Sequence, residues 1–205
     1  MFYKNTNKIK LRELRELCGD KSLIMKIMDK KGFTLIEAMV VVVIIGIATG
    51  IAVPNIVGWM PDYRLKSAAR NLASNFQKAK FEAIKRNTSV VISFTFGPYV
   101  YGGNLGGYQI FVDDGNGGGT AGNKVRDGTE IILSQVTMPQ NISLISANFS
   151  FGSTTPGYNF RGLPLSSIIG NVQLKNSNLR RFRASLSIAG YVNLQSSHDD
   201  GNTWI

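Results

Sequence analysis

The stretch KKGFTLIEAMVVVVIIGIATGIAVP, Lys30–Pro54, is the feature from which the organisation of this chain follows. Within it, Phe33–Val53 holds 21 residues and a single charged side chain, Glu37. A helix of this length spans about 31 Å at about 1.5 Å per residue, which is close to the hydrocarbon thickness of a bilayer. The stretch therefore predicts a transmembrane helix. A buried core helix is the alternative, although a domain of this size rarely hides so long an apolar helix.

Charges on the two sides of this helix predict its orientation. Lysines just before it favour a cytoplasmic N-terminus, and the basic residues that follow lie further away and weaken this bias without reversing it. The lysines are Lys26, Lys30 and Lys31, and the later residues are Arg64, Lys66 and Arg70. Since no small-residue cleavage site follows the apolar run, we expect the helix to be retained rather than removed as a secretory signal.

Glu37 is the unusual residue of the apolar run. A charged acid in hydrocarbon costs about 2.5–3.5 kcal/mol at the centre of the bilayer and less near an end. No Lys or Arg lies three or four residues away on the same helix, so a compensating cation must come from elsewhere. A cut after Gly32 would create an amine on Phe33 at the same depth, and this amine could pair with Glu37 of a neighbouring copy. The acid is therefore predicted to act in assembly.

The residues around this acid resemble a known signal. Lys30–Glu37 resembles the class III signal of type IV pilins and type II secretion pseudopilins. The resemblance implies cleavage by prepilin peptidase between Gly32 and Phe33, and N-methylation of Phe33. It places Glu37 on the glutamate that acts in assembly and Pro54 on the proline that kinks the helix. A glycine before the cut gives a membrane protease access to the backbone.

The same resemblance implies a location and a set of partners. The chain would reside in the bacterial inner membrane as a single-pass protein, with a cytoplasmic N-terminus and a periplasmic C-terminal domain. Its partners would be membrane lipid before assembly, the prepilin peptidase, an inner-membrane assembly platform, and other pilins or pseudopilins in a filament. No cofactor is expected.

The N-terminal 32 residues form the predicted leader, which is longer than the family commonly has. Met25 opens a compact basic leader and is an alternative translation start. Residues 7–28 could instead form an amphipathic helix on the membrane surface. The only cysteine, Cys18, lies in this leader, so no intramolecular disulfide can form. The chain has a formal charge of +10, of which the leader contributes half.

The predicted domain plan places a transmembrane or filament-core helix at 33–57, an amphipathic helix at 58–87 and a β-rich domain at 88–205. Pro61 predicts a local break before the amphipathic helix. Apolar residues there recur every three or four positions, which predicts one face packed on a sheet: Leu65, Ala68, Ala69, Leu72, Phe76, Ala79, Ala83 and Ile84. The basic residues on its other faces favour a solvated surface over DNA or lipid binding.

Strand-like patterns follow the helix. They cover 90–96, 108–112, 130–136, 171–174, 180–188 and a last short strand at 191–194. A helix followed by a run of antiparallel strands predicts an α+β, pilin-like fold, in which the long helix packs on an antiparallel sheet. With the strands and the glycine-rich loop at 113–128, Phe33–Leu194 resembles the GspH/FimT family of minor pseudopilins and minor pilins.

The sequence suggests two further binding functions. Asp113, Asp114 and Asp127 in the glycine-rich loop could hold a calcium ion, but a plain hairpin connection is the favoured interpretation. Some members of the resembled family bind DNA through arginines near the C-terminus. The corresponding turn here, Gly190–Asn193, has none, and this leaves three nearby arginines as candidate DNA contacts: Arg180, Arg181 and Arg183. Strand alternation places Arg181 and Arg183 on one face, and Phe182 in the core.

The sequence does not predict an enzyme. Its one histidine, His198, lies beside two acids in a polar tail that we expect to be loosely held, without a second ligand cluster or a nucleophile motif. The predicted function is that of a minor pseudopilin or pilin, a filament subunit of a type II secretion pseudopilus or a type IV pilus. A DNA-binding minor pilin for DNA uptake is the alternative, and an unprocessed membrane sensor is a more distant one.

Overall fold

The computed structural model describes residues 32–96 and 106–205. The predicted leader up to residue 31, with Met25 and Cys18, lies outside the described residues. The chain divides into two units, Met1–Ala52 and Val53–Ile205, and each is described by itself below.

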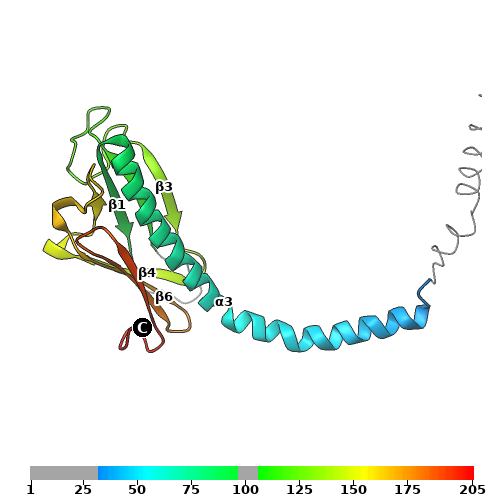
Figure 1. Cartoon of the computed structure of the whole chain (residues 1–205). Coiled ribbons are helices and arrows are strands. Elements are labelled where there is room, and N and C mark those ends of the chain that lie inside the picture. Colours follow the sequence, from blue (N-terminus) through cyan, green and yellow to red (C-terminus); the bar gives the residue numbers. More distant parts are fainter. Residues whose placement is uncertain (1–31, 97–105) are drawn as a thin grey trace, which may run out of the picture. The chain divides into compact units, whose positions relative to one another are not determined.

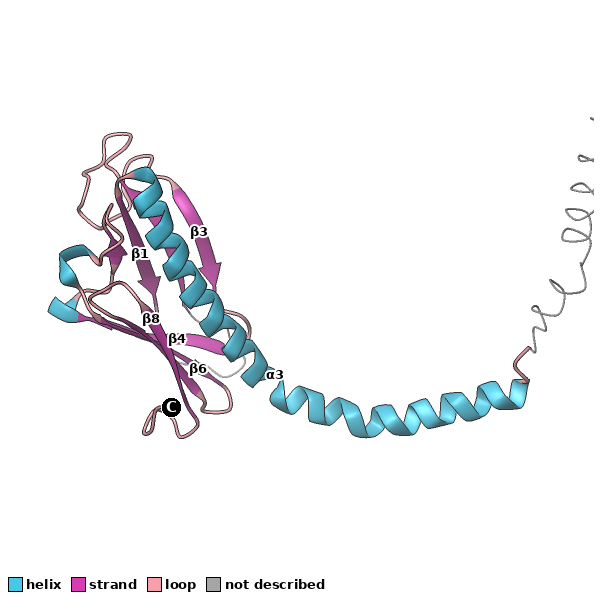
Figure 2. Cartoon of the chain, viewed as in Figure 1, coloured by secondary structure: helices cyan, strands magenta, loops and turns pink. Residues whose placement is uncertain are grey.

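One helix, α3, runs from Leu35 to Arg86 and is shown in Figure 2. It starts at Thr34, whose hydroxyl accepts the Glu37 N–H at 3.2 Å in the manner of an N-cap. It ends in a Schellman motif, because Asn87 has a positive φ of 52° and the Thr88 N–H reaches the carbonyl of Ala83 at 3.2 Å. Both ends of the helix are therefore set by local sequence.

The predicted break at Pro61 is wrong, because α3 is continuous through both Pro54 and Pro61. A proline removes only its own N–H bond to the preceding turn, so it bends a helix without necessarily ending it. Pro61 is buried, and Leu65, one turn later, is also buried in the core, so packing holds the helix together on the C-terminal side of this proline. The two helical segments predicted at 33–57 and 58–87 form a single element.

In residues 32–96 and 106–205, eight strands form two antiparallel four-stranded sheets, where the sequence predicted one sheet. The first has the order β3-β2-β1-β5, with β1 Ser89–Thr95, β2 Gly107–Asp113, β3 Ile132–Thr137 and β5 Gly157–Tyr158. The second has the order β4-β6-β7-β8, with β4 Ile142–Phe149, β6 Gly170–Asn176, β7 Arg181–Leu186 and β8 Val192–Ser197. Two short 3-10 helices, η1 Ser150–Gly152 and η2 Leu165–Ser167, lie between strands.

Strands β4 and β5 were not predicted. The pairing of β4 with β6 shifts between Leu144 and Ser146, which marks a β-bulge. Before the shift the even-numbered Ile142 and Leu144 are buried, and after it the odd-numbered Ala147 and Phe149 are. The bulge thus interrupts the period of two that identifies a strand in a sequence. Strand β5 is too short to produce such a pattern.

The second half of α3 and both sheets share one hydrophobic core (Figure 1). The helix contributes the apolar face predicted from its spacing, with the exception of Ile84, which is exposed. An aromatic cluster joins the three layers: the Phe94 ring on β1 lies 6.1 Å from Phe76 on α3, 5.9 Å from Tyr108 on β2 and 6.2 Å from Phe149 on β4. These rings tie the helix to both sheets.

Candidate functional site

The candidate assembly segment comprises Gly32, Phe33 and Glu37 at the start of α3. Gly32 and Phe33 precede the helix, and Phe33 is 80% exposed. Glu37 lies in the first helical turn and is also exposed. The peptide between Gly32 and Phe33 thus lies outside the hydrogen-bonded helix.

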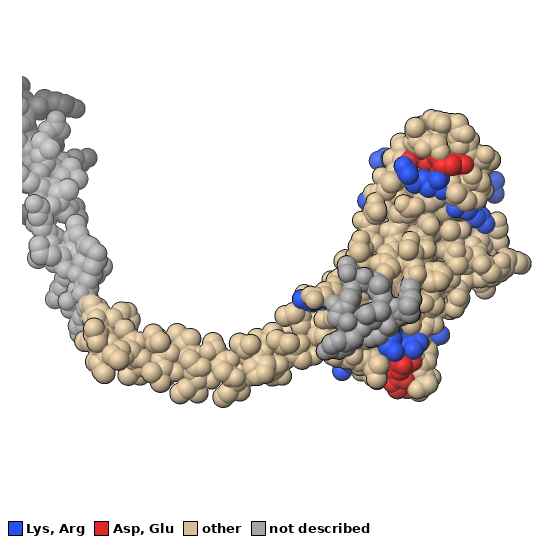
Figure 3. Space-filling model, turned by 180° about the vertical axis from the view of Figure 1, so that it is seen from behind, with Lys and Arg blue, Asp and Glu red and all other residues tan. Residues whose placement is uncertain are grey.

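The helix that follows presents apolar side chains without protein cover. By length and composition this helix can cross a membrane, and its most apolar stretch is not buried against the rest of the protein. Large apolar residues are exposed from Leu35 to Trp59, and Figure 3 shows an uncharged surface along most of this stretch. Such a surface calls for lipid or other helices, because water solvates it poorly.

The three candidate DNA-contacting arginines are engaged within the chain. Arg180 forms an ion pair with Asp62 at 3.1 Å, and Arg181 with Asp200 at 2.8 Å. Arg183 donates to the Gln195 side chain at 2.7 Å, and its guanidinium lies 4.3 Å from the centre of the Trp204 ring. A phosphate at Arg181 or Arg183 would compete with these partners, whereas Arg180 uses only its Nε for Asp62 and is 43% exposed.

Phe182, which alternates with the arginines on β7, packs against the core as predicted. The turn Ser187–Tyr191 between β7 and β8 carries no arginine, in agreement with the sequence. Nothing in residues 32–96 and 106–205 gathers these arginines into a phosphate-binding site.

A network of polar contacts around Asp62, made by Asn176, Asn178 and Arg180, was not predicted from the sequence. The buried Asn176 at the end of β6 donates its side-chain amide to the Asp62 carboxylate at 2.6 Å. Asn178 in the following turn donates to the same oxygen at 3.2 Å and to the carbonyl of Gly58 at 3.1 Å. Together with Arg180 these contacts fix the β6–β7 turn against α3 near Pro61. The run Asn176–Arg180 predicts a turn, but not its partner on the helix.

The glycine-rich loop is organised by carboxylates that accept backbone N–H groups. Asp113, only 1% exposed, accepts from Gly122 at 2.7 Å and Lys124 at 2.9 Å. Asp127 accepts from Thr120 at 3.2 Å, and buried Glu130, which was predicted to begin a strand, accepts from Gly115 at 3.1 Å. Among the described residues, no group of three or more acidic, histidine or cysteine side chains is placed to hold a metal ion.

Asp114, the third candidate calcium ligand, accepts from the N–H of Asn116 at 3.1 Å. The loop carboxylates therefore act as internal caps of a folded loop. Hydrogen bonds donated by these N–H groups stabilise the ionised carboxylates within the loop.

The C-terminal tail is folded back on the second sheet, so the expected loose tail is wrong. Ile205 exchanges two backbone hydrogen bonds of 2.9 Å with Ser196 at the edge of β8. The Ser197 hydroxyl, followed by the hydroxyl and N–H of Thr203, holds the pKa of Asp199 far below its usual range. His198 is exposed between these groups. Local side-chain caps of this kind give no periodic signal in a sequence.

Asp200 gives a pH-dependent prediction. Hydrogen bonds from Arg181, and then from Lys175, lower the pKa of the Asp200 carboxyl, which is 39% exposed. An Asp whose pKa is lowered in the folded state stabilises the fold at pH values above its ordinary pKa of about 3.9. This stabilisation is lost as the pH falls through the pKa of the folded state. The free energy of unfolding of the wild type should therefore fall below about pH 4, and Asp200→Asn should make this fall smaller. After solvent screening, the difference between the two proteins is at most about 1 kcal/mol.

Urea unfolding of the full chain in detergent, at a series of pH values, measures this effect. Asp114→Asn, which removes an acid bonded only to a nearby N–H, is the matched control. An equal flattening in both variants would contradict the assignment to Asp200.

Comparison with known proteins gives two family matches. The model of type II transport protein GspH matches residues 68–190, and the prokaryotic N-terminal methylation motif matches residues 27–53. The second match contains Gly32, Phe33 and Glu37.

Two curated relatives are similar over shorter stretches. The pilin-like protein PilA1 of Thermus thermophilus is 38% identical over 87 residues, which are 42% of this chain and 50% of that protein. The type IV major pilin protein PilA of Myxococcus xanthus is 37% identical over 82 residues, 39% of this chain and 36% of that protein. The similarity thus spans half of the length of these relatives or less.

Among solved structures, the type IV minor pilin FimU of Pseudomonas aeruginosa is 15% identical. One crystal form gives a TM-score of 0.44 over 66% of this chain and 99% of that chain, and a second gives 0.45 over 68% and 96%. The GspH model alone covers more than half of the present sequence. The chain therefore belongs to the family of type II transport protein GspH, and it carries a prokaryotic N-terminal methylation motif at the start of its apolar helix.

Proposed function

We propose that this protein is a minor pseudopilin or pilin, a structural subunit of a type II secretion pseudopilus or a type IV pilus. The observation that carries the proposal is the apolar first half of α3, which has no protein cover, directly behind a methylation motif. In the bacterial inner membrane lipid covers this surface, with the N-terminus cytoplasmic and the C-terminal domain periplasmic. In a filament the helices of neighbouring subunits replace the lipid.

Processing creates the group that assembly needs. Prepilin peptidase cuts the peptide between Gly32 and Phe33, and the new amine on Phe33 is methylated, which leaves its positive charge in place. Residues 1–32 are the leader removed in this step, and Pro54 bends the helix that remains. Glu37 is exposed and forms no ion pair among the described residues, so its carboxylate is available to a second subunit.

In the filament, Glu37 pairs with the Phe33 amine of a neighbour. The attraction between the two charges is stronger in a dry helix bundle than in water, but desolvation offsets part of the gain. The pair therefore fixes the axial register of neighbouring helices at least as much as it stabilises the filament. The assembly platform and the other subunits of the filament are the partners that this step requires.

The first test is the mature N-terminus of protein from native membranes. Mass spectrometry should find a chain that starts at Phe33 and carries one added methyl group on its amine. The reason is that Gly32 and Phe33 lie just before α3 and within the match to the methylation motif. A variant in which Gly32 is replaced by valine should keep the leader, since a β-branched side chain hinders access to the cut bond. An intact leader on most of the wild-type protein would overturn the proposal.

The DNA-uptake alternative gains no specific support from the described residues, since the three arginines are engaged by side chains of the same chain. We therefore propose the structural role alone.

A further inference from the structure

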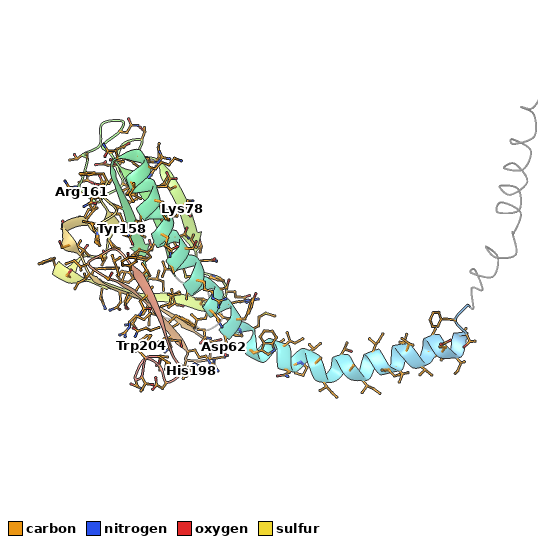
Figure 4. All side chains as sticks on the ribbon, viewed as in Figure 1. Asp62, Lys78, Tyr158, Arg161, His198 and Trp204 are labelled. Carbon is orange, nitrogen blue, oxygen red and sulfur yellow. The ribbon has the colours of Figure 1, made fainter. Side chains whose placement is uncertain are left out.

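A hollow of about 610 Å³ lies in the unit Val53–Ile205, where α3 passes the ends of β7 and β8. It is partly open to solvent. The helix supplies Trp59, Asp62, Tyr63, Leu65 and Lys66, and the second sheet with its tail supplies Arg180, Phe182 and Ser196–His198. Figure 4 shows Asp62 on α3 and His198 after β8 at the same end of the domain. A smaller hollow of about 170 Å³ adjoins it, shares Tyr63 and Lys66, and adds Arg70.

The two hollows have a net positive lining. The carboxylate of Asp62 is already used, because one oxygen accepts from Asn176 and Asn178 and the other pairs with Arg180. Lys66 and Arg70, one helical turn apart, have no acidic partner among the residues that the structure describes. Arg180 uses its Nε for Asp62, and its side chain is 43% exposed. Cations therefore remain available for an anionic ligand.

Two exposed aromatic rings lie on the helix just before these cations. Trp59 is 52% exposed and Tyr63 is 66% exposed, and their rings meet edge to face at 6.4 Å. Large aromatic rings with one polar atom are enriched where hydrocarbon meets headgroups, because they are solvated on both sides of that boundary. The order along α3 is thus apolar side chains, then two aromatic rings with Asp62 between them, then three basic residues, Arg64, Lys66 and Arg70.

The helical rise sets the depth of these residues. Ala38–Val57 contains 20 residues without a charge, which span about 30 Å, the thickness of the hydrocarbon core. Trp59 follows directly after this run and Gly58, at the place where the aromatic ring of a membrane boundary is expected. Lys66 lies seven residues further along α3, about 10 Å by helical rise, from where its flexible chain can extend back toward the headgroups.

We propose that this hollow binds the headgroup of an anionic phospholipid of the outer leaflet. The phosphate is held by Lys66, Arg70 and the free edge of Arg180, and Trp59 and Tyr63 contact the glycerol and the first methylenes of the acyl chains. This inference rests on the proposed function, because it requires the helix to span a membrane before assembly. The bound lipid sets the depth and rotation of the subunit until the filament takes it up.

The proposed headgroup site is tested by measuring whether the full chain prefers an anionic lipid over a zwitterionic one. Purified protein in detergent is mixed with equal amounts of phosphatidylglycerol and phosphatidylcholine, and native mass spectrometry counts the lipids that stay bound. A cation near an anionic headgroup strengthens binding about fivefold, so Lys66→Gln with Arg70→Gln should lower the preference for phosphatidylglycerol by about 25-fold. Lys85→Gln with Arg161→Gln removes two other exposed charges and should leave the preference unchanged.

Each outcome bears on the inference. An unchanged preference in the Lys66/Arg70 variant, or an equal loss in the Lys85/Arg161 variant, would overturn it. If inorganic phosphate at millimolar concentration removes the preference, the hollow is a general anion site. If duplex DNA binds at physiological salt more tightly than phosphatidylglycerol vesicles do, and the Lys66/Arg70 variant loses this DNA binding, the hollow is part of a nucleic-acid surface. Either result would also refute the lipid assignment.

Failure of the membrane proposal is detected separately. Alkaline extraction of membranes should leave the wild type and the Lys66/Arg70 variant in the pellet, because the apolar helix anchors both. If the wild type were extracted, the proposed function itself would fail. If both stay in the pellet without any lipid preference, only the headgroup site is refuted.

Discussion

Glu37→Ala is expected to reduce incorporation into filaments by at least about tenfold while cleavage after Gly32 proceeds. Removal of one partner from a buried ion pair costs about 3–5 kcal/mol, because the other charge is left unpaired in a dry environment. Here the unpaired group is the Phe33 amine of a neighbour. The helix start is unaffected, since the capping bond joins the Thr34 hydroxyl to the backbone N–H of residue 37 and not to its side chain.

Quantification of the subunit in sheared or purified filaments, against its amount in membranes, measures this effect. Glu37→Gln is the matched variant, because it keeps the size of the side chain and loses the charge. Both variants should be equally defective if charge is the cause. Normal incorporation of Glu37→Ala would refute the pairing, and normal incorporation of Glu37→Gln alone would assign the role to shape or hydrogen bonding.

Phe76→Ala is expected to lower the free energy of unfolding of the C-terminal domain by about 3–5 kcal/mol. Phe76 is 1% exposed and faces the core from α3, where its ring lies 6.1 Å from that of Phe94 within the aromatic cluster. Truncation removes buried apolar surface and leaves a cavity that the flanking layers cannot close. At roughly 2–4 °C per kcal/mol, the melting temperature should fall by about 6–20 °C.

Phe81→Ala on the same helix is the control. Phe81 is 68% exposed, so its truncation removes little buried surface and should change the melting temperature by no more than about 1–2 °C. Thermal unfolding of the full chain in detergent, followed by near-ultraviolet circular dichroism, compares the two. Equal effects would mean that α3 is not attached to the sheets through Phe76.

Features that depend only on residues close together in the sequence were predictable. The spacing of the apolar residues from Leu65 to Ala83 predicted the face that α3 buries, because a helix repeats every 3.6 residues wherever it lies. The methylation motif and the exposed apolar helix likewise depend on consecutive residues. Six of the eight strands were found for the same reason, although their ends moved by one or more residues.

Features that depend on contacts between distant segments were not predictable. The bulge in β4 displaces its alternation and arises from pairing with β6, about thirty residues later. The division into two sheets follows from which strands pair across the core, and no local pattern specifies this.

Charged residues show the same contrast most clearly. Consecutive positions were enough to place Glu37 in an apolar helix and to predict that its compensating cation comes from another chain. The partners of Arg180, Arg181 and Arg183 come from α3, the tail and β8, and only the folded chain brings them within hydrogen-bond distance. An isolated acid in hydrocarbon is costly whatever the fold around it, whereas the partner of a surface arginine depends on which segments the fold places beside it.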